Sequence, residues 1–206
     1  MKESPHEISV RKSPTQQRAR VTVDGILEAA QLIISKEGYD YATTNHIAEI
    51  AGVSIGTVYQ YFPRKEAIVA ALVEQLVVTV SEPIRRYMLE SMQVPLARCM
   101  PTLIGMVLNS RRQMSLLLRR LPRDATKLCE DSVPFTSERF LFKTTSDFFK
   151  SHLGEFRIDD IDMAIYVSEY LCIGVIDGYL ADPTPKLLDE QVVEHLSDTI
   201  LMFLTR

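Results

Sequence analysis

The feature that most restricts the fold of this chain is the pattern of small and apolar residues between positions 43 and 62. Two helices that cross steeply through a tight turn need a small residue at the crossing, such as Ala48, and a turn residue that accepts a positive φ, such as Gly52. The crossing also needs a small apolar core at fixed spacing, and the chain supplies Ile47, Ala51, Val53 and Val58. The segment therefore predicts a helix-turn-helix, in which Ser54 caps the second helix.

The second helix of this motif has one face suited to a DNA major groove. When Val58 faces the core, Gly56 and Gln60 point away from it, because a helix turns by about 100° per residue. A glycine permits close approach, a glutamine can pair with an adenine edge, and neighbouring polar side chains suit phosphate oxygens. The candidate DNA-binding residues are Thr43, Thr44, Ser54, Ile55, Gly56, Thr57, Tyr59, Gln60, Tyr61 and Lys65. The competing interpretation is a small helical subdomain with tyrosines in its core.

Several short motifs of this region match those of a known family. They are Thr43, Ile47-Ala48, Ala51-Gly52-Val53-Ser54, Gly56-Thr57, Tyr59, Tyr61-Phe62 and Lys65-Glu66. In these positions residues 21–75 resemble the N-terminal domain of TetR-type transcriptional regulators. The resemblance implies a three-helix DNA-binding domain followed by a larger helical domain that binds a ligand and dimerises. Because the second domain varies widely in this family, it implies no particular ligand residues.

The remainder of the chain is also predicted to be helical. From Val23 the apolar residues follow a helical period, with Thr22 as the expected cap and Gly38 as the stop. Further helices are expected at about 64–89, 95–109, 111–121, 134–152, 158–181 and 187–204. We therefore predict an all-α protein with three parts: a flexible basic arm (1–20), a helix-turn-helix domain (21–66) and a helical regulatory and dimerisation domain (67–206).

The basic arm is a second candidate for contact with DNA. Arg11, Lys12, Arg18 and Arg20 follow one another without an intervening acidic residue. Such side chains can lie along phosphates or in a minor groove. The alternative is a solvated tail.

The regulatory part contains candidates for two further sites. The middle helices concentrate methionines and aromatic residues, which adapt to irregular cavities but also form ordinary cores. The candidate ligand-binding residues are Met88, Met92, Met106, Phe148, Tyr166 and Tyr170. Near the C-terminus, apolar stripes and two glycines four residues apart suit a helical dimer interface. The candidate dimer residues are Ile165, Cys172, Gly174, Gly178, Val192, Leu196 and Phe203.

Composition excludes several other classes of protein. The net charge of −4 argues against indiscriminate coating of nucleic acid. We expect no membrane span and no secretory signal, and the three cysteines have no metal-ligand spacing, so a cytoplasmic protein without a metal or cofactor is expected. The run Arg111, Arg112, Arg119, Arg120 and Arg123 is expected to be a solvated face, with an anion-binding arginine as the alternative.

Together these patterns predict a sequence-specific transcriptional regulator that is a ligand-responsive homodimeric repressor, and not an enzyme. Its expected partners are a pseudo-palindromic duplex operator, a second copy of the chain and an unidentified small-molecule effector. Alternatives within this class are an activator or a regulator that responds to oxidation of a thiol. A helical adaptor that keeps the helix-turn-helix as a scaffold, or a helical enzyme, belongs to a different class.

Overall fold

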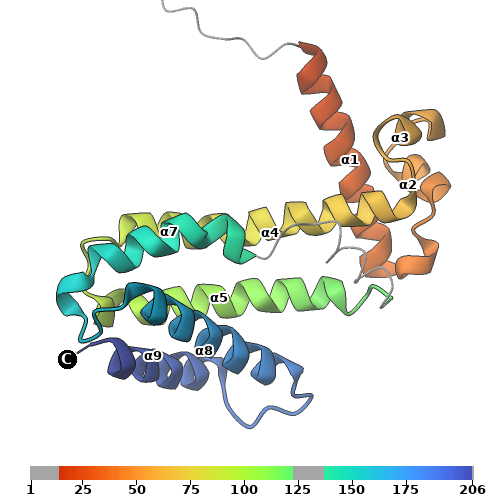
Figure 1. The fold of residues 1–206 in the computed structure, drawn as a ribbon. Helices are drawn as coiled ribbons and strands as arrows, with labels where there is room; N and C mark the ends of the chain where they lie inside the picture. The colour runs from red at the N-terminus through yellow and green to blue at the C-terminus, as the bar shows by residue number, and fades with distance from the viewer. Residues whose placement is uncertain (1–13, 123–136, 206) are drawn as a thin grey trace, which may run out of the picture. The chain divides into compact units, whose positions relative to one another are not determined.

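The computed structural model describes residues 14–122 and 137–205, and all of its regular elements are helices (Figure 1). The α-helices are α1 (Pro14–Lys36), α2 (Thr44–Ile50), α3 (Ile55–Tyr61), α4 (Lys65–Glu90), α5 (Leu96–Leu118), α7 (Ser137–Ser151), α8 (Ile161–Ala181) and α9 (Asp189–Leu204). Two short 3₁₀ turns, η1 (Tyr39–Tyr41) and η2 (Leu153–Glu155), complete the regular structure of these residues. The predicted all-α fold is confirmed.

The chain divides into two compact units at residue 72. The first contains α1, α2, α3 and the first turns of α4, and its core is built where α1 packs on α2 and α2 packs on α3. Fully buried side chains from all four helices meet there: Ile26, Ala30, Ile33, Ile34, Ile47, Val58 and Ile68. Burying such side chains contributes about 1.5–3 kcal/mol each, so this small core can hold the short helices α2 and α3, which would not form alone.

Helix α1 begins earlier than the sequence pattern predicts. It starts at Pro14, and Thr22 lies within it, where its hydroxyl donates to the carbonyl oxygen of Arg18 over 3.0 Å. The predicted cap at Thr22 is therefore wrong. Proline is tolerated in the first turn of a helix, and the residues that follow it are good helix formers, so the helix extends beyond its buried stripe. The predicted stop at Gly38 is confirmed, since this residue has φ 105°.

The second unit is a helical bundle in which α5 packs against α8 and α9, and α7 packs against α8. Its core is continuous and draws on α4, α5, α7, α8 and α9, with Phe148, Ile104, Ile176 and Leu204 among its fully buried side chains. Helix α5 is one continuous helix, whereas the sequence pattern predicted a break near residue 110. Because neither glycine nor proline occurs between 109 and 111, nothing interrupts its backbone hydrogen bonds there.

Helix α8 starts three residues later than expected. Asp160 is its cap, and one carboxylate oxygen accepts a hydrogen bond from the backbone N–H of Met163 over 3.0 Å. This cap satisfies a backbone donor that the helix itself leaves unpaired.

Two helices are long and apolar enough for a membrane span, although no membrane span was expected from the sequence. By length and composition alone α4 and α8 could each cross a membrane, with mean hydropathies of 1.6 and 1.3. Both also contribute side chains to the cores described above, such as Ile68 and Ile176. Core helices of soluble proteins pass the same test, so the match is weak evidence for a membrane span.

The backbone geometry of the first unit predicts opposite effects for two glycine substitutions. Gly52 has φ 66°, so Gly52→Ala should lower the free energy of unfolding by about 1–2 kcal/mol. Gly25 lies inside α1 with no atom within 4 Å of an added Cβ, so Gly25→Ala should raise it by up to about 1 kcal/mol. Urea unfolding followed by circular dichroism measures both, and equal signs would contradict the assigned turn.

Candidate nucleic-acid interface and internal cavity

The helix-turn-helix is held by two side-chain caps and one glycine turn. Thr43 Oγ1 accepts a hydrogen bond from the backbone N–H of His46 over 3.2 Å and begins α2. Ser54 Oγ accepts one from the backbone N–H of Thr57 over 3.0 Å and begins α3. Between them Gly52 adopts the positive φ that the sequence pattern required. The predicted helix-turn-helix is confirmed, including the cap at Ser54.

One face of α3 is exposed to solvent. Ile55, Gly56, Tyr59 and Gln60 are exposed, while Val58 on the opposite face is fully buried. A Cβ at Gly56 would meet only Ser54 Oγ, at 3.7 Å. Packing among the described residues therefore does not require a glycine at position 56. Because Gly56 has no side chain, the exposed face of α3 is shallow at its centre.

Some of the candidate DNA-binding residues contact one another. The hydroxyls of Thr44 and Tyr59 lie 3.3 Å apart, and those of Ser54 and Thr57 lie 2.8 Å apart. Tyr59 is 54% exposed, so its hydroxyl can also reach beyond the unit. The contact of Tyr59 with the start of α2 was not predicted, because it depends on how α3 packs against α2. Tyr61 is 38% exposed, so it is more buried than Tyr59.

Lys65 has a structural role besides the predicted phosphate contact. Its ammonium donates to the backbone carbonyl oxygen of Tyr39 over 3.1 Å and lies 3.7 Å from the centroid of the Tyr39 ring. A lysine has three N–H donors, so a second contact stays possible. Of the candidate arm, Arg18 and Arg20 lie on α1, whereas Arg11 and Lys12 are outside the described residues.

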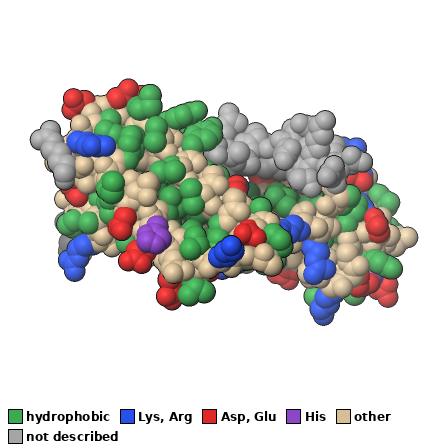
Figure 2. Space-filling model, turned by 90° about the horizontal axis from the view of Figure 1, so that it is seen from below, with side chains coloured by type: hydrophobic (Ala, Val, Ile, Leu, Met, Phe, Trp, Pro, Cys, Tyr) green, Lys and Arg blue, Asp and Glu red, His purple; other side chains and the backbone are tan. Residues whose placement is uncertain are grey.

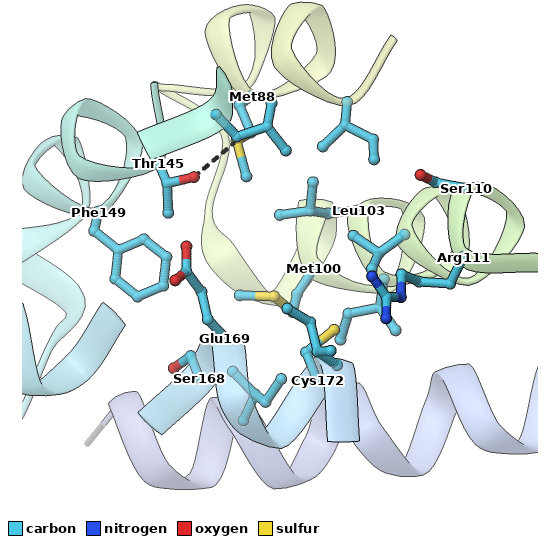
Figure 3. Close-up of a pocket in the computed structure, with 16 residues that line it drawn as sticks. Met88, Met100, Leu103, Ser110, Arg111, Thr145, Phe149, Ser168, Glu169 and Cys172 are labelled. Atoms are coloured by element: carbon cyan, nitrogen blue, oxygen red, sulfur yellow. Dashed lines mark hydrogen bonds between the residues drawn. The ribbon is translucent and has the colours of Figure 1, made fainter. Parts of the chain in front are cut away.

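The second unit contains an apolar cavity among α4, α5, α7, α8 and α9 (Figure 3). Its volume is about 110 Å³. Most of its wall consists of aliphatic, thioether and aromatic side chains, including Ile84, Met88, Met100, Leu103, Ile104 and Phe149. Its polar wall residues are few and come from three helices: Ser110, Arg111, Thr145, Ser168 and Glu169.

Only one of the six candidate ligand residues lines this cavity, namely Met88. Phe148 is fully buried in the core, and Met106 packs against that core. Met92 is half-buried, outside the cavity wall. Tyr166 and Tyr170 are 59% and 62% exposed and stack against each other with ring centroids 4.5 Å apart. Met92 lies between α4 and α5, and for the other five candidates the sequence did not indicate which face of the helix lines the cavity. Neighbouring positions on a helix point about 100° apart, so being on the right helix does not place a side chain in the cavity wall.

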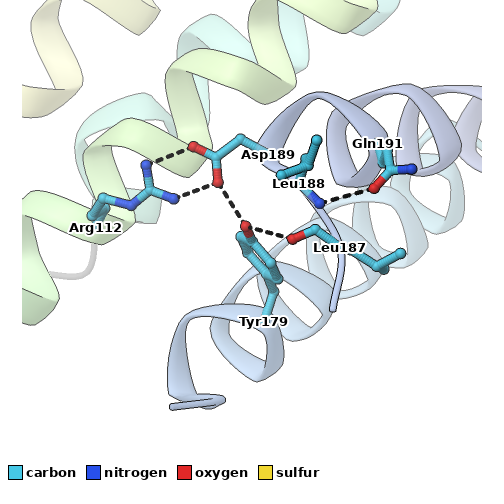
Figure 4. A network of polar contacts seen from close by, with 6 residues as sticks. All are labelled: Arg112, Tyr179, Leu187, Leu188, Asp189 and Gln191. Carbon is cyan, nitrogen blue, oxygen red and sulfur yellow. Dashed lines mark hydrogen bonds and ion pairs between the residues drawn. The ribbon is translucent and has the colours of Figure 1, made fainter. Parts of the chain in front are cut away.

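Two arginines of the expected solvated face lie in ion pairs instead. The guanidinium of Arg111 donates to both carboxylate oxygens of Asp177 on α8, one of them 2.9 Å from Nε. Arg112 donates to both oxygens of Asp189 over 2.7 and 2.6 Å (Figure 4). The carboxylate partners lie 66 and 77 residues further along the chain. The arginine run by itself therefore gives no indication of these ion pairs.

Tyr179 joins the Arg112 pair to the start of α9 (Figure 4). Its hydroxyl donates to Asp189 Oδ1 over 2.7 Å and lies 3.2 Å from the carbonyl oxygen of Leu187. Hydrogen bonds from Arg112, and then from Tyr179, hold the pKa of Asp189 below its usual value. The same contact to Asp189 raises the pKa of Tyr179. The network therefore fixes the first residue of α9 against both α5 and α8.

The thiols of the two described cysteines are free and buried. Burial raises the pKa of Cys172, in the cavity wall, to about 12, and burial also raises the pKa of Cys99. Such thiols stay protonated at neutral pH, whereas the thiolate is the reactive form. Cys129 lies outside the described residues. Among the described residues, no group of His, Cys, Asp and Glu side chains could hold a metal ion.

Most of the candidate dimer residues face the interior of this unit. Ile165, Cys172, Val192 and Leu196 are buried in its core, and Phe203 is half-buried. Gly174 and Gly178 are exposed. The outer stripe of α8 is instead formed by Met163, Tyr166, Tyr170, Gly174 and Gly178, all exposed and repeating every three or four residues. The sequence analysis did not separate this exposed stripe from the stripe that faces the core, because apolar residues occur on both faces of α8.

Comparison with known proteins places the first unit in a family. Residues 26–72 match the family model for bacterial regulatory proteins, tetR family. The chain is 43% identical over 56 residues to the uncharacterized HTH-type transcriptional regulator YvkB of Bacillus subtilis, a match covering 27% of this chain and 30% of that protein. The match thus spans less than a third of that relative.

Solved structures resemble nearly the whole chain in fold. A protein from Mesorhizobium loti described as a TetR-family transcriptional regulator has a TM-score of 0.68 at 16% identity, over 92% of this chain and 99% of that one. NalD, the secondary repressor of the MexAB-OprM multidrug efflux pump in Pseudomonas aeruginosa, gives 0.63 at 20% identity, over 91% and 98%. RolR in complex with resorcinol gives 0.58 at 18% identity, over 92% and 90%. These likenesses establish the fold of both units.

The Asp189 network predicts a pH dependence of stability. Because the folded pKa of Asp189 lies below its unfolded value, the network stabilises the fold above about pH 4 and is lost as the pH falls through the folded pKa. Asp189→Asn should therefore lower the free energy of unfolding by roughly 1 kcal/mol at pH 7 and by much less near pH 2, since exposed ion pairs contribute little. Urea unfolding across this range measures the difference.

The matched control is Asp198→Asn, an exposed aspartate on the same helix. It should change stability by a few tenths of a kcal/mol or less at either pH. Equal effects of the two substitutions would contradict the role given to Asp189.

Proposed function

We propose that this chain is a helix-turn-helix transcriptional regulator of the TetR family, whose model residues 26–72 match, and that it is a homodimeric repressor whose release from DNA is controlled by a small molecule. The regulators of this family bind DNA and are not enzymes. The proposal includes action in the cytoplasm, where an operator and a small effector are both accessible.

The observation that carries the DNA-binding part is the exposed face of α3. Gly56 lies at its centre and has no packing role, and the polar residues Tyr59 and Gln60 lie beside it. A helix that enters a major groove needs such a face, with a shallow centre and hydrogen-bonding groups at its edge. In this proposal the hydroxyls of Thr43, Thr44 and Thr57 bind phosphate oxygens and fix the register.

The exposed apolar stripe on α8 supports the dimer. Met163, Tyr166 and Tyr170 are each more than half exposed, and Met202 on α9 is 75% exposed. In Figure 2, hydrophobic side chains are frequent on the face that is seen from below. Large exposed apolar side chains that repeat along a helix favour burial against a partner. A two-fold dimer formed through α8 and α9 would bury this stripe and use Gly174 and Gly178 for close approach of the helices.

The cavity and α4 together suggest how a ligand would act. Helix α4 begins in the first unit and supplies Ile84 and Met88 to the cavity wall in the second. A ligand that binds better when α4 is displaced would shift the dimer toward conformations unsuited to the operator. A complete shift, from 1:99 to 99:1, needs about 5.5 kcal/mol of differential affinity.

The alternatives have less support. The raised pKa values of Cys99 and Cys172 disfavour a regulator that responds to oxidation through these thiols. An adaptor that uses the helix-turn-helix as a scaffold does not explain an exposed Gly56 between polar residues. An activator uses the same DNA contacts as a repressor and differs in where its operator lies, so it remains the second candidate.

Gly56→Glu tests the DNA-binding face without damaging the fold. Glutamate near the start of a helix is favourable, and the position has room for a side chain, so the unfolding free energy should stay within about 0.5 kcal/mol. Binding to a duplex selected by the protein should fall at least tenfold, because one good base contact alone is worth about 1–3 kcal/mol. Fluorescence anisotropy at a fixed salt concentration measures the affinity.

Asn109→Glu is the charge-matched control, since Asn109 is exposed on α5 in the other unit. It should leave the affinity within about twofold, as a single distant charge contributes little at physiological salt. If both variants bind like the wild type, α3 is not the DNA-reading helix.

A further inference from the structure

The cavity wall contains a buried hydroxyl without a hydrogen-bond partner. Ser168 is 5% exposed, and its Oγ has no partner among the described residues. A buried polar group left unpaired costs about 1–3 kcal/mol, so such groups are uncommon in folded proteins. Ser168 lies on α8 one turn before Cys172, and both residues line the cavity (Figure 3). A molecule in the cavity can supply the partner that the described residues do not.

The charged groups at the cavity, by contrast, already interact within the chain. Arg111 gives two hydrogen bonds to Asp177, and Glu169 interacts with another group of the chain. A charged ligand would have to displace one of these interactions in a largely apolar surrounding, where an uncompensated charge is costly. A neutral ligand leaves both in place.

The size and wall of the cavity restrict the ligand further. A dry apolar cavity of roughly 150 Å³ is known to accept benzene, so a volume of about 110 Å³ corresponds to a molecule of about one ring. Met88 and Met100 can adjust their flexible side chains to its outline, and Phe149 offers an aromatic ring. The wall favours an apolar molecule with a single polar atom.

We propose that the cavity binds a neutral one-ring molecule that carries a hydroxyl group, such as a simple phenol. The ring lies among Met88, Met100 and Leu103, and its oxygen accepts a hydrogen bond from Ser168 Oγ. This inference deepens the proposed function, since it names the chemical class of the effector. In this proposal, the hydrogen bond from Ser168 makes the cavity prefer a ring with a hydroxyl group over a purely apolar ring.

The test measures binding directly on the intact protein, without DNA. Protein labelled with ¹³C at its methionine methyl groups is titrated with p-cresol, p-xylene, 4-methylbenzoate and 4-methylbenzylammonium, and NMR follows each methionine. p-Cresol should bind most tightly and shift the signals of Met88 and Met100. The signals of Met163 and Met202, which are exposed outside the cavity wall, should not move.

Two serine variants identify the hydrogen bond. Ser168→Ala should weaken p-cresol binding about three- to tenfold, the range for one neutral hydrogen bond, and should leave p-xylene binding unchanged. Ser81→Ala is the matched control, because Ser81 Oγ is also buried and unpaired but is not in the cavity wall. It should leave both affinities unchanged.

Three results would overturn the proposal. One is tighter binding of the carboxylate or the ammonium compound than of p-cresol. Another is no shift at Met88 and Met100 with any of the four probes. The third is an equal effect of Ser168→Ala and Ser81→Ala on p-cresol. None of these results bears on DNA binding, so a failure here is distinguishable from a failure of the proposed repressor function.

Discussion

The turn at Gly52 is the constraint on which the proposed DNA interface depends. Its positive φ lets the chain leave α2 and start α3 at once, with Ser54 as the cap. Since Val58 must then point into the small core, the opposite face of α3 is necessarily exposed. The exposure of Gly56 and Gln60 is therefore a consequence of backbone geometry and of one buried valine. A side chain at position 52 would disturb the direction of α3 before it disturbed any contact with DNA.

In the second unit, ion pairs connect helices that are distant in the sequence and orient them around the apolar core. Arg111 and Arg112 are neighbours on α5, yet the first pairs with α8 and the second with the start of α9. Both pairs are partly exposed, so they contribute orientation more than stability. Arg111 also lines the cavity. A molecule in the cavity thus lies next to the residue that links α5 to α8, the helix that carries the exposed apolar stripe.

The local features were predictable from the sequence, and the long-range ones were not. Gly52, Ser54 and the buried positions Ile47 and Val58 follow from spacing within twenty residues, whereas Ala51 and Val53, also predicted for this core, are only half-buried. The burial of Cys172 and the exposure of Tyr166 and Tyr170 depend on which neighbours α8 meets, and an almost wholly apolar helix gives no periodic signal for that. The pairing of Arg112 with Asp189 and the unpaired hydroxyl of Ser168 likewise depend on partners from other helices. A serine four residues before a cysteine was a weak sign of a shared face, but not of a cavity.

Selection of binding sites from a pool of random duplexes tests the central claim most directly. The purified protein is first shown to be folded and dimeric, and selection is carried out at a stated salt concentration, since affinity for DNA depends steeply on salt. The account predicts enrichment of an inverted repeat whose half-sites are about one helical turn, or a multiple of it, apart. Enrichment of no sequence by the folded dimer, with or without a phenol present, would contradict it.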